Sequence, residues 1–307
     1  KLRQKAKILG IDESNKWIFN AVFIDKTLLR NKLMYELFRK MRKGNIAPKI
    51  EMIQFYHDFQ YEGIYQLTQK MDKNSLDVSG NGGMIFKDCP VFNAEKINPQ
   101  EPDSYYQQNF PKLKDKDYNK YMDSLYNLIH YSTDSHFKKI IPQLFDLESI
   151  TDWQLMIMLS NNGDGVLKNF YLYKQDIVSK FKIAIWDYDA TLGRDGDTEL
   201  NLMKTKSNWE RNVLLNRLYN LNVEGYKENL AERWKYLRTT DVISKRKLLN
   251  DIEIIKNQII SEVPRNFERW PYGSEPFQDS NDFEQELEVI NKFLEIRIPQ
   301  LDKKFNE

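Results

Sequence analysis

Hydrophobic and polar positions follow two different periods along the first third of the chain. Residues 49–56 and 63–71 alternate apolar and polar side chains, which predicts an antiparallel strand pair joined by the polar residues 57–62. A third strand is predicted over residues 84–87. We expect an irregular lead-in over residues 1–23, and a small lobe built from these strands and one helix. That helix, over residues 28–42, has an apolar stripe at helical spacing: Leu29, Leu33, Leu37 and Met41.

Helical periodicity dominates the rest of the chain. The segment 89–120 is polar and rich in proline, so we expect it to be a long connection between two lobes. The fold class is therefore α+β, with a small mixed lobe that contains an antiparallel sheet and a second lobe that is mostly helical. The predicted helices of the second lobe are 121–131, 137–145, 150–159, 208–221, 226–239, 242–263 and 282–305.

The stretch 160–197 contains two short strands with polar residues at their ends. Residues 170–173 and 181–186 are rich in aromatic and β-branched side chains, and the segment between them is short enough for a hairpin. In an antiparallel pair, the start of the first strand lies beside the end of the second. We therefore expect Asp164, Asn169 and Asp187 to converge, and this set of oxygen ligands suggests a metal ion and a phosphate.

The spacing of these residues is typical of phosphoryl-transfer enzymes of the kinase type. Asn169 follows Asp164 by five positions, as in the kinase loop in which Asp orients the acceptor hydroxyl and Asn binds metal. Asp187 then stands where a second metal-binding Asp is found. The spacing of Asp164 and Asn169 alone is common in solvated loops. The position of Asp187 after the predicted hairpin is what supports the kinase interpretation. Three cations are candidates for binding nucleotide phosphates: Lys87, at the end of a predicted strand, and then Lys70 and Arg30.

A phosphatase is the main alternative from the same stretch. Residues 183–192 form an apolar strand followed by D-x-D-x-T, the first motif of haloacid-dehalogenase-type phosphatases. Asp187 would then be the nucleophile and Asp189 the general acid and base. That motif normally opens a doubly wound α/β domain, whereas the segments after residue 197 are predicted to be helical. The kinase interpretation is therefore favoured.

The composition limits the remaining function classes. The chain has 46 Lys and Arg residues and 45 Asp and Glu residues, which leaves a net charge of +1. This net charge produces no overall electrostatic attraction for nucleic acid. No apolar run approaches the roughly 18 residues that a membrane span needs. A single cysteine, Cys89, excludes an internal disulfide and a cysteine-based zinc cluster. The three histidines show no metal-ligand spacing.

With these motifs in view, the chain resembles the CotH family of atypical protein kinases of the bacterial spore coat. The matching blocks include 29–38, 61–67, 84–87, 161–173 and 186–193. The resemblance implies a kinase-like fold over residues 1–307, with an N-lobe over about residues 1–100, a linker over about residues 89–120 and a C-lobe over residues 121–307.

The resemblance also implies the chemistry. ATP and Mg²⁺ or Mn²⁺ would be the cofactors, and the γ-phosphoryl group would pass to Ser or Thr of Ser-rich spore coat proteins during sporulation. Asp164 would be catalytic, and Asp187 would bind metal, helped by Asn169 and Asp189. The expected location is the spore coat, after synthesis in the mother-cell cytoplasm. The HRD and DFG triplets of ordinary kinases are absent. An AMP-transferring enzyme of the same fold and an inert coat scaffold remain alternatives.

Overall fold

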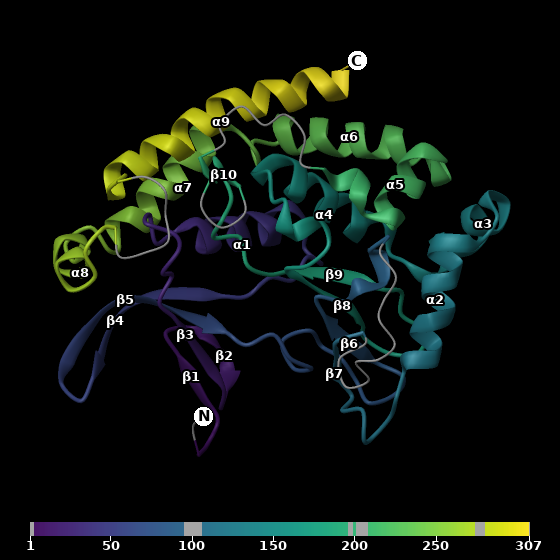
Figure 1. The fold of residues 1–307 in the computed structure, drawn as a ribbon, viewed down its shortest axis with the longest axis horizontal. Coiled ribbons are helices and arrows are strands. Elements are labelled where there is room, and N and C mark those ends of the chain that lie inside the picture. Colours follow the sequence, from purple (N-terminus) through teal and green to yellow (C-terminus); the bar gives the residue numbers. More distant parts are fainter. Residues whose placement is uncertain (1–2, 95–105, 196–198, 201–207, 274–279, 307) are drawn as a thin grey trace.

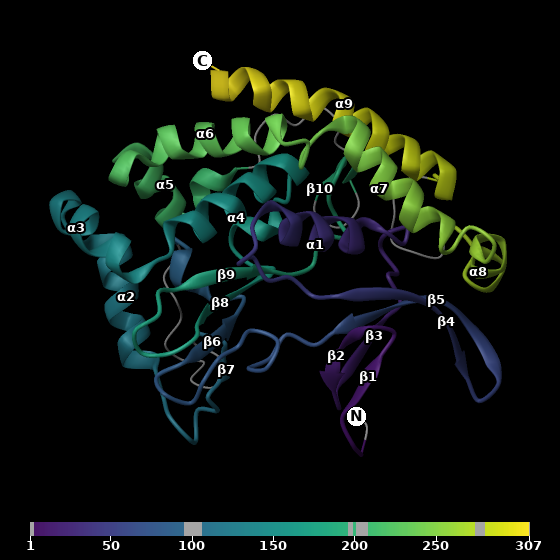
Figure 2. The same ribbon diagram turned by 180° about the vertical axis from the view of Figure 1, so that it is seen from behind.

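The structure is a computed structural model, and it describes residues 3–94, 106–195, 199–200, 208–273 and 280–306. Within this part of the chain the strands form four sheets, and every pair of neighbouring strands is antiparallel. Figures 1 and 2 show three of the sheets on one side of the molecule, helices α1 and α4 above them, and helices α6 and α9 on the opposite side. The fourth sheet, which pairs β10 (Arg194–Asp195) with β11 (Glu199–Leu200), lies among the helices. The coarse α+β prediction is confirmed.

The first sheet has three strands in the order β3-β5-β4. β4 (Ile50–His57) and β5 (Gln60–Gln69) form the predicted hairpin, and β3 (Trp17–Asn20) pairs along the other edge of β5. The irregular lead-in predicted for residues 1–23 is therefore wrong. It contains β3 and a separate hairpin of β1 (Ala6–Ile8) and β2 (Ile11–Ser14).

The second sheet has four strands in the order β7-β6-β8-β9. The predicted hairpin is present as β8 (Phe170–Lys174) and β9 (Lys182–Ile185). β6 (Met84–Lys87) pairs with β8, so its predicted grouping with the early strands is wrong. The pairing of β6 with a strand more than 80 positions later places Lys87 beside the hairpin that carries the acidic residues.

The predicted connection over residues 89–120 is partly structured. β7 (Gln108–Phe110) pairs with β6, and a 3₁₀ turn, η1 (Pro90–Phe92), follows β6 directly. Cys89, Val91 and Phe92 are fully buried in the main core. A polar linker is therefore the wrong description for both ends of this segment, while residues 95–105 lie outside the described part.

The helices agree closely with the predicted ranges. α1 (Arg30–Met41) packs over the sheets, and α4 (Leu147–Ser160) is buried on almost all sides. The stretch 242–263 is not one helix, because α7 (Lys245–Asn257) ends before α8 (Val263–Arg269) begins. No helix in the described ranges is long and apolar enough to cross a membrane. The other helices are α2 (Asn119–Tyr131), α3 (Asp134–Leu144), α5 (Val213–Asn220), α6 (Tyr226–Thr239) and α9 (Phe283–Asn306).

Candidate active site

The loop between α4 and β8 positions Asp164. α4 ends at Asn161, whose left-handed backbone (φ 55°) terminates the helix. The side chain of Asn162 then accepts a hydrogen bond from the Gly165 amide at 2.7 Å, and residues 164–166 form a 3₁₀ turn. Asp164 remains about one third exposed, with its carboxylate 3.1 Å from the Lys168 ammonium. The Asp164 carboxylate is therefore accessible from solvent.

The hairpin brings the two predicted strand ends together. The Asn169 carbonyl accepts a hydrogen bond from the Trp186 amide at 3.0 Å. The Asn169 side-chain amide donates to the Asp187 carbonyl at 3.2 Å. Of the three residues predicted to converge, Asn169 and Asp187 are therefore in contact, as the antiparallel register of β8 and β9 requires. Asp164, the third, lies near enough for its charge to raise the pKa of Asp187.

Helix α1 holds the segment that follows β9. The Asp187 amide donates to the Tyr35 hydroxyl at 2.8 Å, and the Tyr188 amide donates to the Asn31 side chain at 2.6 Å. Both contacts satisfy backbone groups that no strand partner could reach. The apolar stripe of α1 predicted a core helix, but it gave no sign that Asn31 and Tyr35 would fix this loop.

The acidic residues after β9 are electrostatically unusual. Burial raises the pKa of Asp187, and the charges of Asp164 and Asp88 raise it further, while Asp189 and Lys87 oppose the shift. Burial, followed by the charges of Asp187 and Asp25, raises the pKa of Asp189 to about 7. The hydrogen bond between the two side chains raises the pKa of Asp189 and lowers that of Asp187.

These carboxylates fit a hard divalent cation. A bound cation would relieve the repulsion that raises both pKa values, and carboxylate oxygen is the ligand that Mg²⁺ prefers. Within the described residues, no group of three or more acidic, histidine or cysteine side chains could hold an ion by itself. Mg²⁺ commonly uses one or two carboxylates and completes its shell with water and substrate phosphates. Asp187 and Asp189 alone would therefore leave most of the coordination shell of such an ion to other ligands.

Lys87 lies close to Trp186 and Asp187. Its ammonium is 3.4 Å from the Asp88 carboxylate and 5.7 Å from the centre of the Trp186 ring, and its charge opposes the raised pKa of Asp187. Asp88 in turn accepts a hydrogen bond from the Asn169 amide at 2.7 Å. The sequence pattern did not single out Asp88, whose only signal is its position next to Lys87.

A pocket of about 320 Å³ opens between the first sheet and these acidic residues. Asp187 and Asp189 contribute one wall, and the cleft-facing side of the sheet contributes another. The wall residues are Ile18, Phe19, Asn20, Ala21, Asn31, Tyr35, Ile50, Gln66, Thr68, Trp186, Asp187 and Asp189.

The other two candidate cations lie elsewhere. Lys70 lines a separate pocket of about 270 Å³ together with Lys16, Lys73 and Lys112. Arg30 is fully buried at the start of α1, and its guanidinium binds Asp25, Glu286 and the Thr191 carbonyl. Neither residue is among the described side chains that line the pocket with Asp187.

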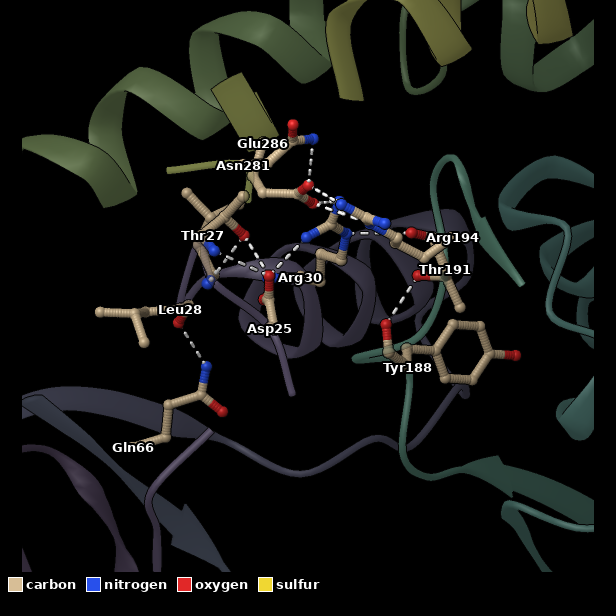
Figure 3. A network of polar contacts seen from close by, with 11 residues as sticks. Asp25, Thr27, Leu28, Arg30, Gln66, Tyr188, Thr191, Arg194, Asn281 and Glu286 are labelled. Carbon is tan, nitrogen blue, oxygen red and sulfur yellow. Dashed lines mark hydrogen bonds and ion pairs between the residues drawn. The ribbon is translucent and has the colours of Figure 1, made fainter. Parts of the chain in front are cut away.

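Figure 3 shows the network that Arg30 joins. Glu286 of α9 binds both Arg30 and Arg194, and Arg30 also binds Asp25. The Thr191 hydroxyl donates to the Tyr188 carbonyl at 2.6 Å. The network therefore connects the start of α1 and the start of α9 to the segment directly after Asp189.

Comparisons with known proteins find a family model and similar proteins. A family model described as "CotH kinase protein" matches residues 1–300. The inner spore coat protein H of Bacillus subtilis (strain 168) is 26% identical over 183 residues, which are 57% of this chain and 49% of that protein. A protein of Plasmodium falciparum (isolate 3D7) is 24% identical over 177 residues, 54% of this chain and 4% of that protein. The chain thus spans about half of one relative and a small part of the other.

Proposed function

Because the chain belongs to the CotH kinase protein family, we propose that it is an ATP-dependent protein kinase that phosphorylates serine or threonine of spore coat proteins. The convergence of Asn169, Asp187 and Lys87 beside the pocket that Asp189 lines is the observation that carries the proposal. The spore coat context comes from the name of the Bacillus subtilis relative. Residues 1–307 would act as one catalytic domain, with the cleft between the first sheet and residues 186–189.

The proposed reaction transfers the γ-phosphoryl group to a hydroxyl oxygen. The new bond joins that oxygen to the γ-phosphorus, the bond from the γ-phosphorus to the bridging oxygen breaks, and ADP leaves. Asp164, whose side chain is about one third exposed, orients the hydroxyl and receives its proton. Lys87 balances charge on the phosphates.

Asp187 and Asp189 would hold Mg²⁺ or Mn²⁺. The ion, when bound, neutralises phosphate charge and aligns the phosphoryl group for transfer. Asn169 presents only its side-chain oxygen to such an ion, because its amide nitrogen already donates to the Asp187 carbonyl. Most of the rate gain in this scheme comes from positioning and charge neutralisation.

The antiparallel second sheet argues against the phosphatase alternative. In the phosphatase fold the D-x-D motif follows a strand of a doubly wound parallel sheet, whereas β9 is the edge strand of β7-β6-β8-β9. The Asp187 backbone also adopts a left-handed conformation (φ 56°), and its amide is bound to Tyr35. This geometry suits a fixed metal ligand.

A labelled-nucleotide experiment tests the proposal. The protein is incubated with Mg²⁺ or Mn²⁺, a Ser-rich polypeptide and ATP labelled at either the α or the γ position. We expect γ-label on the polypeptide, and we expect Asp164→Asn and Asp187→Asn to abolish its transfer. Asp58→Asn is the matched control, because Asp58 is 90% exposed at the tip of the β4–β5 hairpin.

The label separates the alternatives. Transfer of the α-label alone would replace the kinase by an AMP-transferring enzyme of the same fold. Absence of both labels, together with no ATP binding in calorimetry, would support an inert scaffold. Full γ-transfer by both Asp164→Asn and Asp187→Asn would refute the residue assignment.

A further inference from the structure

Gln66 presents a buried hydrogen-bond acceptor that no described residue satisfies. The residue lies in the middle of β5, and its side chain is fully buried. Its amide nitrogen donates to the Leu28 carbonyl at 2.8 Å, whereas its amide oxygen has no partner. Burying a carbonyl oxygen without a donor is unfavourable, so such a group inside a ligand pocket points to a donor on the ligand.

The orientation of this amide is fixed by its surroundings. Exchanging the nitrogen and the oxygen would place the oxygen against the Leu28 carbonyl, which is also an acceptor. The backbone of Gln66 is paired on both sides, with Asn20 of β3 and Met52 of β4, so the residue cannot shift along the sheet. In Figure 3 the amide nitrogen points to Leu28 and the oxygen points away from it.

Gln66 is part of the pocket wall that also contains the acidic residues. Gln66 lines the same space of about 320 Å³ as Asp187 and Asp189. Ile18 and Ile50 also line it, and both pair with Thr68, two positions further along the same face of the sheet. The ligand therefore meets carboxylates on one wall, and an acceptor with apolar neighbours on the other.

The hydrogen-bonding groups of ATP indicate which part of the nucleotide faces each wall of the pocket. Its phosphates carry no hydrogen-bond donors at neutral pH, so they cannot satisfy Gln66. Only the nucleoside has donors, namely the exocyclic amino group of adenine and the ribose hydroxyls. We infer that Gln66 accepts a hydrogen bond from the nucleoside of the bound nucleotide and that this contact sets nucleotide selectivity. The inference rests on the proposed function.

Two sources of the donor can be distinguished by analogues. Purine riboside triphosphate carries a hydrogen atom in place of the exocyclic amino group, while 2′-deoxy-ATP and 3′-deoxy-ATP each lack one ribose hydroxyl. We expect one of these analogues to bind the unaltered protein about tenfold more weakly than ATP, because it leaves the buried carbonyl unpaired. Calorimetry with Mg²⁺ measures this without turnover.

A variant connects the loss to Gln66. Gln66→Met has a similar volume and no acceptor, so it should bind ATP about tenfold more weakly and should no longer distinguish ATP from the affected analogue. Gln54→Met is the matched control, because Gln54 lies in the neighbouring strand β4 with an exposed side chain, and it should keep both affinities.

The outcomes are decisive. Equal affinity of the unaltered protein for ATP and all three analogues would overturn the inference, even if Gln66→Met does not fold. Unchanged selectivity in a folded Gln66→Met protein would also overturn it. If γ-phosphoryl transfer is found while either result holds, the kinase proposal stands and only the role of Gln66 fails. If the unaltered protein binds no ATP, both proposals fail together.

Discussion

Neutralising Glu286 should destabilise the whole fold. Its carboxylate is almost fully buried, lies 3.0 Å from the Arg30 guanidinium, and also binds Arg194. Glu286→Gln keeps the shape of the side chain but removes the charge that faces two buried guanidinium groups. Removing one partner of a buried ion pair typically costs about 3–5 kcal/mol. We expect a loss of about 3 kcal/mol in the free energy of unfolding, since Asp25 still binds Arg30.

The matched control lies two residues earlier in the same helix. Glu284 pairs with Lys256 at 3.0 Å, but its side chain is 63% exposed. An exposed pair contributes about 0–1 kcal/mol, so Glu284→Gln should leave stability nearly unchanged. Urea unfolding followed by circular dichroism gives both free energies. A loss below about 1 kcal/mol in Glu286→Gln, or equal losses in the two variants, would refute the reasoning that charge burial governs this network.

Three further predictions concern other buried groups. The folded-state pKa of Asp189 is about 7, against an ordinary value of 3.8. Without metal, the stability that Asp189 contributes is therefore present at low pH and is lost as the pH rises from about 4 through 7. Thermal melts in EDTA should show that Asp189→Asn loses less stability over this pH range than the unaltered protein does. Burial raises the pKa of the Cys89 thiol to about 12, so a disulfide-exchange reagent should label it only after unfolding, and rapid labelling of the native protein would contradict this. The Asn266 side chain accepts the Ile64 amide at 2.8 Å, so Asn266→Ala should cost about 1–3 kcal/mol in urea unfolding, whereas the exposed Asn220→Ala should cost much less.

Local patterns were sufficient to predict most of the helices and two hairpins, β4–β5 and β8–β9, but not the β1–β2 hairpin. The β8–β9 hairpin is joined by a short polar turn, so its register and the meeting of Asn169 with Asp187 could be derived from adjacent residues. Pairings between distant segments could not be derived in this way. β3 pairs with β5 about 50 positions later. β3 has only four residues, and most of them are partly exposed, so its sequence shows no clear alternation of apolar and polar side chains.

The prediction that Arg30 binds a phosphate rested on its positive charge alone. An arginine at the start of a predicted helix is usually solvated, and a free guanidinium would suit a phosphate. Its burial depends on Asp25 nearby and on Glu286, which lies 256 positions away. Such a compensating charge has no periodic or local signature, and therefore only the tertiary structure reveals that the guanidinium is already occupied.

The backbone at the candidate site explains why polar residues are needed there for more than chemistry. Asp88, Asn169 and Asp187 all have left-handed backbones, with φ of 53°, 62° and 56°. Asn and Asp tolerate this region better than other non-glycine residues, but the conformation still carries strain. Hydrogen bonds offset it, because the Asn169 amide donates to Asp88 and the Asp187 amide donates to Tyr35. Each residue therefore turns the chain away from its strand and holds the next one in place. This mutual support keeps the carboxylates close together despite their repulsion.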